Sequence, residues 1–174
     1  MFKELIILKI FMESPTREFN VREVARLLEI SPANVSSKLK EFSKQKFLKE
    51  RKERNLLLYK SNLDSQEFRD LKLYYNIRKI RESGLIDELN KFYLKPIIIF
   101  FGSAYYGLDT EDSDLDLVIL SEKTKEFEKT KEFEKRLNRR IQLFIIKNIK
   151  DLKNNHLINN VLNGIVIQGD LKWI

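Results

Sequence analysis

The chain has 174 residues, of which 43% are hydrophobic and 34% charged, and its formal net charge is +7. This length suits one large domain or two small ones, and the apolar content is sufficient for a core. The absence of cysteine excludes disulfides and thiolate metal sites. No apolar run approaches the roughly 20 residues that span a bilayer. Glu4 and Lys9 interrupt the N-terminal apolar patch, so we expect a cytoplasmic protein without membrane contact.

The positive charge is concentrated in the first third of the chain. Residues 1–62 hold 14 Lys and Arg against 8 Asp and Glu, a net +6, whereas residues 63–174 hold 19 against 18, a net +1. This asymmetry is typical of a nucleic-acid-binding module attached to a neutral second domain.

Three helices are predicted in this basic segment. The first contains the apolar residues of 5–11. Asn20 is a good N-cap for the second, with Glu23 three residues later as in a capping box. The third is predicted to begin at Ser31, with Pro32 at its first helical position. The spacing of these helices indicates a helix-turn-helix.

The third helix and the segment after it are candidates for DNA contact. Val35, Leu39 and Phe42 recur at inward-facing positions, so the polar residues between them are left outside. Residues 47–51 and 56–60 are predicted to form two strands, with a basic turn at 52–55. The candidate DNA-binding residues are Asn34, Ser36, Ser37, Lys38, Lys40, Lys44, Arg51, Lys52 and Arg54.

The arrangement over residues 1–62 resembles the winged helix-turn-helix domains of MarR-like and ArsR-like transcriptional regulators. The resemblance rests on pattern and implies binding to double-stranded DNA. The alternative is a small helical domain that makes protein contacts and has a solvated, Lys-rich face.

Residues 63–94 are predicted to connect two domains. Ser65 can cap a helix that is apolar around most of its circumference, and Ser83 and Gly84 break the segment before a shorter helix. A helix buried on more than one side indicates either an interdomain helix in a monomer or the interface of a homodimer, and the sequence leaves both open.

The second domain, residues 95–174, carries the chemistry. Ile97–Phe101 is an apolar run long enough for a buried strand, and Gly102 and Ser103 end it. Asp114 and Asp116 then stand in an apolar frame that predicts a second strand, with both carboxylates on one face. Two like charges this close favour a bound divalent cation, and Mg²⁺ pairs with one or two carboxylates plus substrate phosphates. We expect the amides after Gly102 and the Ser103 hydroxyl to cradle phosphate at a helix N-terminus.

The segment from Gly102-Ser103, across ten residues, to Asp114-Leu115-Asp116 resembles the signature of the polymerase-β-like nucleotidyltransferases, above all their minimal branch, known largely as antitoxins of HEPN-domain toxins. The resemblance covers roughly residue 95 to the C-terminus. It implies that Gly102 and Ser103 bind nucleotide, that Asp114 and Asp116 are catalytic metal ligands, and that nucleotide monophosphate, from ATP above all, is transferred to a partner toxin.

The remainder of the domain departs from the family in one position. A strand at 140–146 places Gln142 where the family usually supplies a third carboxylate, so a two-metal site is doubtful. Before it, the hexapeptide TKEFEK occurs twice, at 124–129 and 130–135, and is predicted to form one exposed helix. A helix from residue 147 and a last strand at 165–167 follow, and His156, the only histidine, is expected to be structural or surface-exposed.

The sequence therefore predicts an α+β protein with an N-terminal winged helix and a small mixed-sheet nucleotidyltransferase domain. Its predicted activity is Mg²⁺-dependent nucleotidyl transfer to a protein partner. The alternative is a transcription regulator whose degenerate second domain senses nucleotide, and a third hypothesis is a degenerate transferase that only binds a protein partner.

Overall fold

The structure is a computed structural model that describes residues 5–171. Glu4, which interrupts the N-terminal apolar patch, lies outside this range. The chain divides into two compact units, residues 1–72 and 73–174. The division falls inside helix α4 (Gln66–Glu82), within the segment 63–94 that the sequence marks as connecting. Among the helices of residues 5–171, none combines the length and the apolar character that crossing a bilayer requires.

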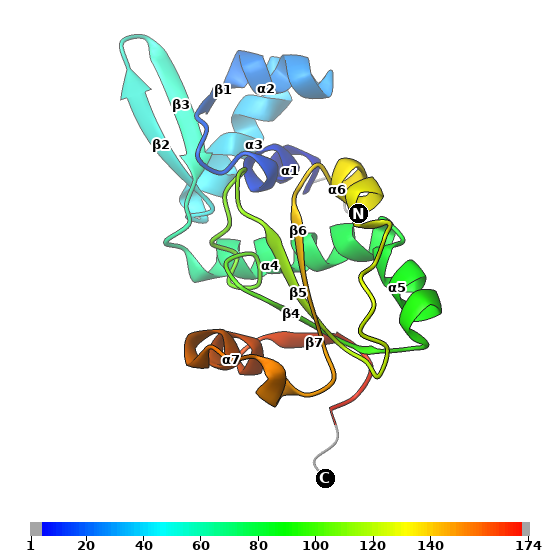
Figure 1. Cartoon of the computed structure of the whole chain (residues 1–174). Coiled ribbons are helices and arrows are strands. Elements are labelled where there is room, and N and C mark those ends of the chain that lie inside the picture. The colour runs from blue at the N-terminus through cyan, green and yellow to red at the C-terminus, as the bar shows by residue number, and fades with distance from the viewer. Residues whose placement is uncertain (1–4, 172–174) are drawn as a thin grey trace. The chain divides into compact units, whose positions relative to one another are not determined.

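The first unit contains helices and a three-stranded antiparallel sheet with strand order β1-β3-β2. The hairpin β2–β3 extends away from the three helices (Figure 1). The elements are α1 (Leu5–Glu13), β1 (Phe19–Asn20), α2 (Val21–Leu28), α3 (Pro32–Lys44), β2 (Leu48–Glu53) and β3 (Leu56–Ser61).

The predicted starts of α2 and α3 are confirmed. Asn20 Oδ1 accepts a hydrogen bond from the Glu23 amide at 3.0 Å, and Ser31 Oγ accepts one from the Asn34 amide at 3.4 Å. Each bond satisfies a donor that the first helical turn leaves without a partner. The Glu23 carboxylate pairs with Arg17.

The hairpin differs from the prediction because its turn is shorter. The prediction gave residues 52–55 to the turn, but Lys52 and Glu53 pair with Leu57 and Leu56 in the ladder. Arg54 adopts a left-handed φ of 51°, which lets two residues reverse the chain.

The second unit begins within α4 and is built on a four-stranded sheet with strand order β6-β5-β4-β7. Strand β4 is antiparallel to β5 and β7, and β5 is parallel to β6. The elements are α5 (Leu85–Tyr93), β4 (Ile97–Phe101), β5 (Leu115–Leu120), α6 (Thr130–Leu137), β6 (Ile141–Ile146), the 3₁₀ helix η1 (Ile149–Asp151), α7 (Asn155–Leu162) and β7 (Ile165–Gln168).

Apolar side chains cover both faces of this sheet. On one face, residues such as Leu115 and Leu117 pack with α5, α6 and the C-terminal part of α4. On the other face, Val118 and its neighbours pack with Leu152 and Val161, from the segment of η1 and α7. The predicted strands at 97–101, 140–146 and 165–167 are confirmed. The helix expected from residue 147 is divided, because Asn154 caps α7 separately and His156 lies exposed in its first turn.

The two copies of TKEFEK have different conformations, so the prediction of one exposed helix is wrong. Only the second copy is helical, and residues 124–127 have no regular structure. Both phenylalanines of the repeat are buried: the Phe127 ring lies 5.4 Å from that of Phe92 and 6.1 Å from that of Phe133. The first copy is therefore a non-helical segment whose one apolar side chain is anchored in the core.

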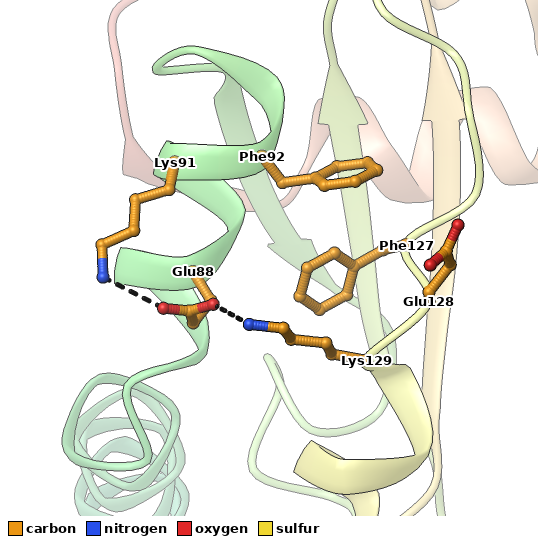
Figure 2. Close-up of a pocket in the computed structure, with 6 residues that line it drawn as sticks. All are labelled: Glu88, Lys91, Phe92, Phe127, Glu128 and Lys129. Atoms are coloured by element: carbon orange, nitrogen blue, oxygen red, sulfur yellow. Dashed lines mark hydrogen bonds and ion pairs between the residues drawn. The ribbon is translucent and has the colours of Figure 1, made fainter.

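An ion pair between Lys129 and Glu88 also holds the first copy of the repeat at the surface. Figure 2 shows the Glu88 carboxylate between two lysines, and it accepts hydrogen bonds from Lys129 at 2.6 Å and Lys91 at 3.0 Å. These bonds lower the pKa of Glu88 to about 2.

Candidate active site

The sheet register brings the signature residues to one end of three strands. Phe101, the last residue of β4, is paired with Asp116 in β5, and Asp116 is in register with Gln142 in β6. Asp114 lies one residue before β5 begins, whereas the sequence placed both aspartates inside the strand. Residues in register on neighbouring strands face the same side of a sheet, so Gln142 lies beside Asp116.

The Asp116 side chain lies on the face of the sheet that α7 covers. Leu115 and Leu117 belong to the core on the opposite face, whereas Val118 belongs to the α7 side. Because side chains alternate along a strand, Asp116 lies on the same face as Val118, and Gln142 does too. Gln142 is exposed and Asp116 is half-buried, so this end of the strands is accessible to solvent.

Gly102 is required at its position for two independent reasons. Its φ of +78° is in the left-handed region that favours glycine. In addition, a Cβ atom at this position would lie 2.1 Å from Asp116 Oδ2. The Asp116 carboxylate thus packs directly against the backbone of the Gly-Ser turn, which joins the two halves of the signature in space.

The chain after Gly102 forms consecutive turns over residues 103–107 and no helix, so the expected helix N-terminus is wrong. Tyr105 and Tyr106 donate their amides to the Gly102 carbonyl at 3.2 and 3.3 Å, and the Leu108 amide donates to the Ser103 carbonyl at 2.9 Å. These bonds close the turn. The Ser103 side chain is exposed and follows Gly102, the residue that contacts Asp116.

The carboxylate pair carries negative charge that the protein only partly compensates. Burial, and then the charge of Asp114, raise the pKa of Asp116 above its usual value, although Arg139 opposes this shift. Asp114 Oδ1 is buried and lies 3.0 Å from Arg140 Nε, within ion-pair distance but without hydrogen-bond alignment. A buried carboxylate oxygen without a hydrogen bond, beside a second carboxylate, is a site that a cation would stabilise.

The donor set fits one hard divalent cation. Within residues 5–171, no group of three or more His, Cys, Asp or Glu side chains is arranged to hold a metal. Asp114 and Asp116 supply two carboxylates, and Gln142 beside them supplies only a neutral side chain. Mg²⁺ held by one or two carboxylates plus substrate phosphates is compatible with this set.

The sequence analysis missed a buried polar network next to the signature. Asp109 is fully buried and accepts hydrogen bonds from Asn76 at 3.1 Å and from Arg139 Nη1 at 2.9 Å. Asn76 also donates to the Ala104 carbonyl at 3.0 Å, and Arg139 Nε donates to the Ser113 carbonyl at 2.7 Å. Asp109 belongs to the polar loop between the two signature halves, and no periodicity in that loop signals burial.

The predicted DNA-contact residues are at least partly exposed, but some already have acidic partners. Arg51 hydrogen-bonds Glu18 with two of its nitrogens and lies 2.8 Å from Glu53, and Lys38 lies 2.9 Å from Glu41. The exposed members of the set are Asn34, Ser37, Lys40, Lys44, Arg51, Lys52 and Arg54, whereas Ser36 and Lys38 are half-buried.

The cavities of the second unit include one that borders the site and one that is apart from it. One, of about 380 Å³, borders the site because Ser113 and Arg140, the neighbour and the ion-pair partner of Asp114, line it. The other, of about 270 Å³, is lined by Phe92, Phe127 and the charged groups around Glu88, none of which is a signature residue (Figure 2).

Residues 82–167 match the family model described as "Nucleotidyltransferase domain". This match supports a polymerase-β-like nucleotidyltransferase domain and a nucleotidyltransferase activity in general. No curated protein matches the chain. Among solved structures, "Reduced HlyU from Vibrio cholerae N16961" is similar with a TM-score of 0.33 and 21% identity, over 52% of this chain and 82% of that chain.

Proposed function

We propose that the protein is a Mg²⁺-dependent nucleotidyltransferase of the minimal type that transfers a nucleoside monophosphate to a protein partner. The observation that carries this proposal is the packing of the Asp116 carboxylate against Gly102. It joins a candidate phosphate-binding turn to a candidate metal-binding pair.

In this proposal, each signature residue has a distinct task. Asp114 and Asp116 hold one Mg²⁺, which supplies Lewis-acid stabilisation of the triphosphate charge. Ser103 and the backbone near Gly102 bind the terminal phosphates of the nucleotide, for which ATP is the first candidate. A hydroxyl of the acceptor attacks the α-phosphorus, its bond to phosphorus forms as the bond to pyrophosphate breaks, and the hydroxyl proton passes to solvent. The neutral Gln142 favours a single-metal site.

The N-terminal unit is proposed to be a winged helix that binds double-stranded DNA. The basic excess of residues 1–62 and the exposed Lys40 and Lys44 on α3 support this. Because Arg51 is neutralised by Glu18 and Glu53, we expect Lys40 and Lys44 to contribute more to phosphate contact than Arg51. Anisotropy of labelled duplex DNA with Lys44→Ala and Arg51→Ala tests this order. Equal losses would contradict it.

The proposed biological setting is a cytoplasmic antitoxin that modifies a HEPN-like toxin and represses its own operon. A homodimer suits binding to a two-fold symmetric operator. The competing function, a transcription regulator whose second unit senses nucleotide without transfer, is favoured by one observation: Gln142 stands in register with Asp116 where a third carboxylate would support catalysis.

The first experiment is incubation with Mg²⁺ and α-³²P-labelled ATP, CTP, GTP or UTP, with the candidate partner protein present. We expect the wild type to transfer label and Asp114→Ala to lose transfer while remaining folded. Asp112→Ala is the matched control, because it removes an exposed carboxylate from the same loop without touching the pair. Full activity of Asp114→Ala would refute the catalytic assignment. Nucleotide binding that changes DNA affinity without transfer would favour the sensor.

A further inference from the structure

The loop between the two halves of the signature is tied at both ends to one buried carboxylate. At its start, the Asn76 amide group donates to the Ala104 carbonyl at 3.0 Å, one residue after Ser103. At its end, Arg139 Nε donates to the Ser113 carbonyl at 2.7 Å, one residue before Asp114. The Asp109 carboxylate accepts from both Asn76 and Arg139.

A main-chain bond extends this anchoring past Asp114, the first aspartate of the pair. The Leu115 amide donates to the Arg140 carbonyl at 2.9 Å, so the residues on both sides of Asp114 are held by residues 139 and 140. Within the loop, the Thr110 amide donates to Ser113 Oγ, and the Ser113 amide donates to the Thr110 carbonyl. The two hydroxyl groups also hydrogen-bond each other, so a closed turn connects Asp109 to Asp114. The network is therefore continuous from the Gly-Ser turn to the metal-binding pair.

The burial of Asp109 makes its position strongly determined. A buried carboxylate is stable only where donors surround it, so Asp109 cannot move without breaking charge-assisted hydrogen bonds. The Arg139 guanidinium is planar and its nitrogens point in fixed directions, so its bonds to Asp109 and Ser113 set the distance between those two residues.

We infer that Asn76, Asp109 and Arg139 are positioning residues that fix the Gly102-Ser103 turn relative to Asp114 and Asp116. The network touches neither nucleotide nor metal in this assignment. It acts by holding the backbone at both ends of the loop, and a loose loop would have to be ordered each time the cation and the phosphates bind. The inference rests on the proposed function, because it concerns the geometry of that site.

The test measures Mn²⁺ binding in the presence of a non-hydrolysable ATP analogue, by the electron paramagnetic resonance signal of free Mn²⁺. Arg139→Lys keeps the charge beside Asp109 but removes the fork that spans Asp109 and Ser113. Asn76→Ala removes the tie at Ala104 and leaves the charges in place. For each variant we expect Mn²⁺ affinity to fall about ten-fold or more, the effect usual for residues that support metal ligands from outside.

Tyr93→Phe is the control for a merely structural effect. It removes the partly buried hydrogen bond from Tyr93 Oη to the Lys125 carbonyl, 2.7 Å long, which lies in the same unit and involves no signature residue. We expect it to lower thermal stability and leave Mn²⁺ affinity unchanged. Affinity that follows melting temperature across all three variants would overturn the inference.

The two proposals fail in different ways. If the wild type binds Mn²⁺ and nucleotide, and both Arg139→Lys and Asn76→Ala bind equally well while folded, only the positioning role is refuted. If the wild type binds neither, the metal site of the proposed function is refuted, and the positioning role is refuted with it.

Discussion

Asp109 and the pair Asp114–Asp116 lie within eight residues of one another, yet their surroundings are opposite. Asp109 is fully buried and receives hydrogen bonds from an amide and a guanidinium. Asp116 is half-buried beside a second carboxylate, and Asp114 Oδ1 is buried without a hydrogen bond. Folding satisfies the first carboxylate fully but compensates the charge of the pair only in part, through Arg140 beside Asp114 and Arg139 near Asp116. This difference separates a structural acid from candidate functional acids close to it in the sequence.

The largest effect is expected from Asp109→Ala. It leaves Arg139, whose side chain is only 12% exposed, without its acidic partner. Breaking a buried ion pair costs about 3–5 kcal/mol of the free energy of unfolding, and we expect a loss near the lower end of this range because Arg139 is not fully buried. Urea denaturation measures this loss. Asp112→Ala, an exposed carboxylate of the same loop, should stay within about 0.5 kcal/mol of the wild type. Equal effects at the two positions would remove the distinction between structural and surface acids.

Gly102→Ala tests the contact between the turn and Asp116. We expect a loss of about 2 kcal/mol from backbone strain and displacement of the carboxylate, together with loss of metal-dependent transfer. Gly84→Ala is the matched control, since its φ of +81° is similar but the nearest atom to an added Cβ is Arg136 Nη1 at 3.7 Å. Transfer lost in both variants, or in neither, would contradict the role of the Gly102 contact.

Asp116→Asn should stabilise the protein near pH 7, whereas Asp109→Ala and Gly102→Ala should destabilise it. Because burial and the charge of Asp114 raise the pKa of Asp116 in the folded state, the folded protein binds more protons than the unfolded chain. The stability of the wild type therefore falls as pH rises from the unfolded pKa of about 3.9 through the folded one. The amide variant should lose this slope and be slightly more stable than the wild type near pH 7, while losing transfer. A variant less stable than the wild type near pH 7 would contradict this.

Two tyrosines extend the comparison to hydroxyl groups. Tyr93 Oη has a hydrogen-bond partner, whereas Tyr59 Oη is buried without one in the described residues. Tyr93→Phe should cost about 1 kcal/mol and Tyr59→Phe almost nothing. Burial also raises the pKa of Tyr93 to about 12, so its contribution to stability should fall as pH rises from about 10 to 12 and be absent in Tyr93→Phe. Urea denaturation measures both losses. Equal losses in the two variants would contradict the stabilising role of the Tyr93 hydrogen bond.

Gln142→Glu has the smallest expected effect on stability, about 0.5 kcal/mol or less, because the side chain is exposed. It adds a third carboxylate beside Asp116, so we expect about ten-fold tighter Mn²⁺ binding. Gln168→Glu, at the end of β7, is a control for added charge alone. Tighter binding in both variants would indicate a general charge effect instead of a third ligand.

The sequence alone determined the elements whose signals are local. Ser31 followed by Pro32, and the apolar run of β4, each specify a helix start or a strand through the nearest few residues, and both are confirmed. The Gly-Ser and Asp-Leu-Asp spacing predicts the site residues from the sequence, and the register of β4, β5 and β6 places Asp116 beside Phe101 and Gln142.

Tertiary structure alone decided the conformation of the repeated hexapeptide and the role of Asp109. Two identical sequences, at 124–129 and 130–135, have identical local preferences, yet only the second is helical. The difference arises because Phe127 packs against Phe92 and Lys129 binds Glu88, contacts that residues distant in the chain supply. Asp109 is likewise satisfied by Asn76 and Arg139, about 30 residues away on either side, so its burial has no signal in the sequence around it.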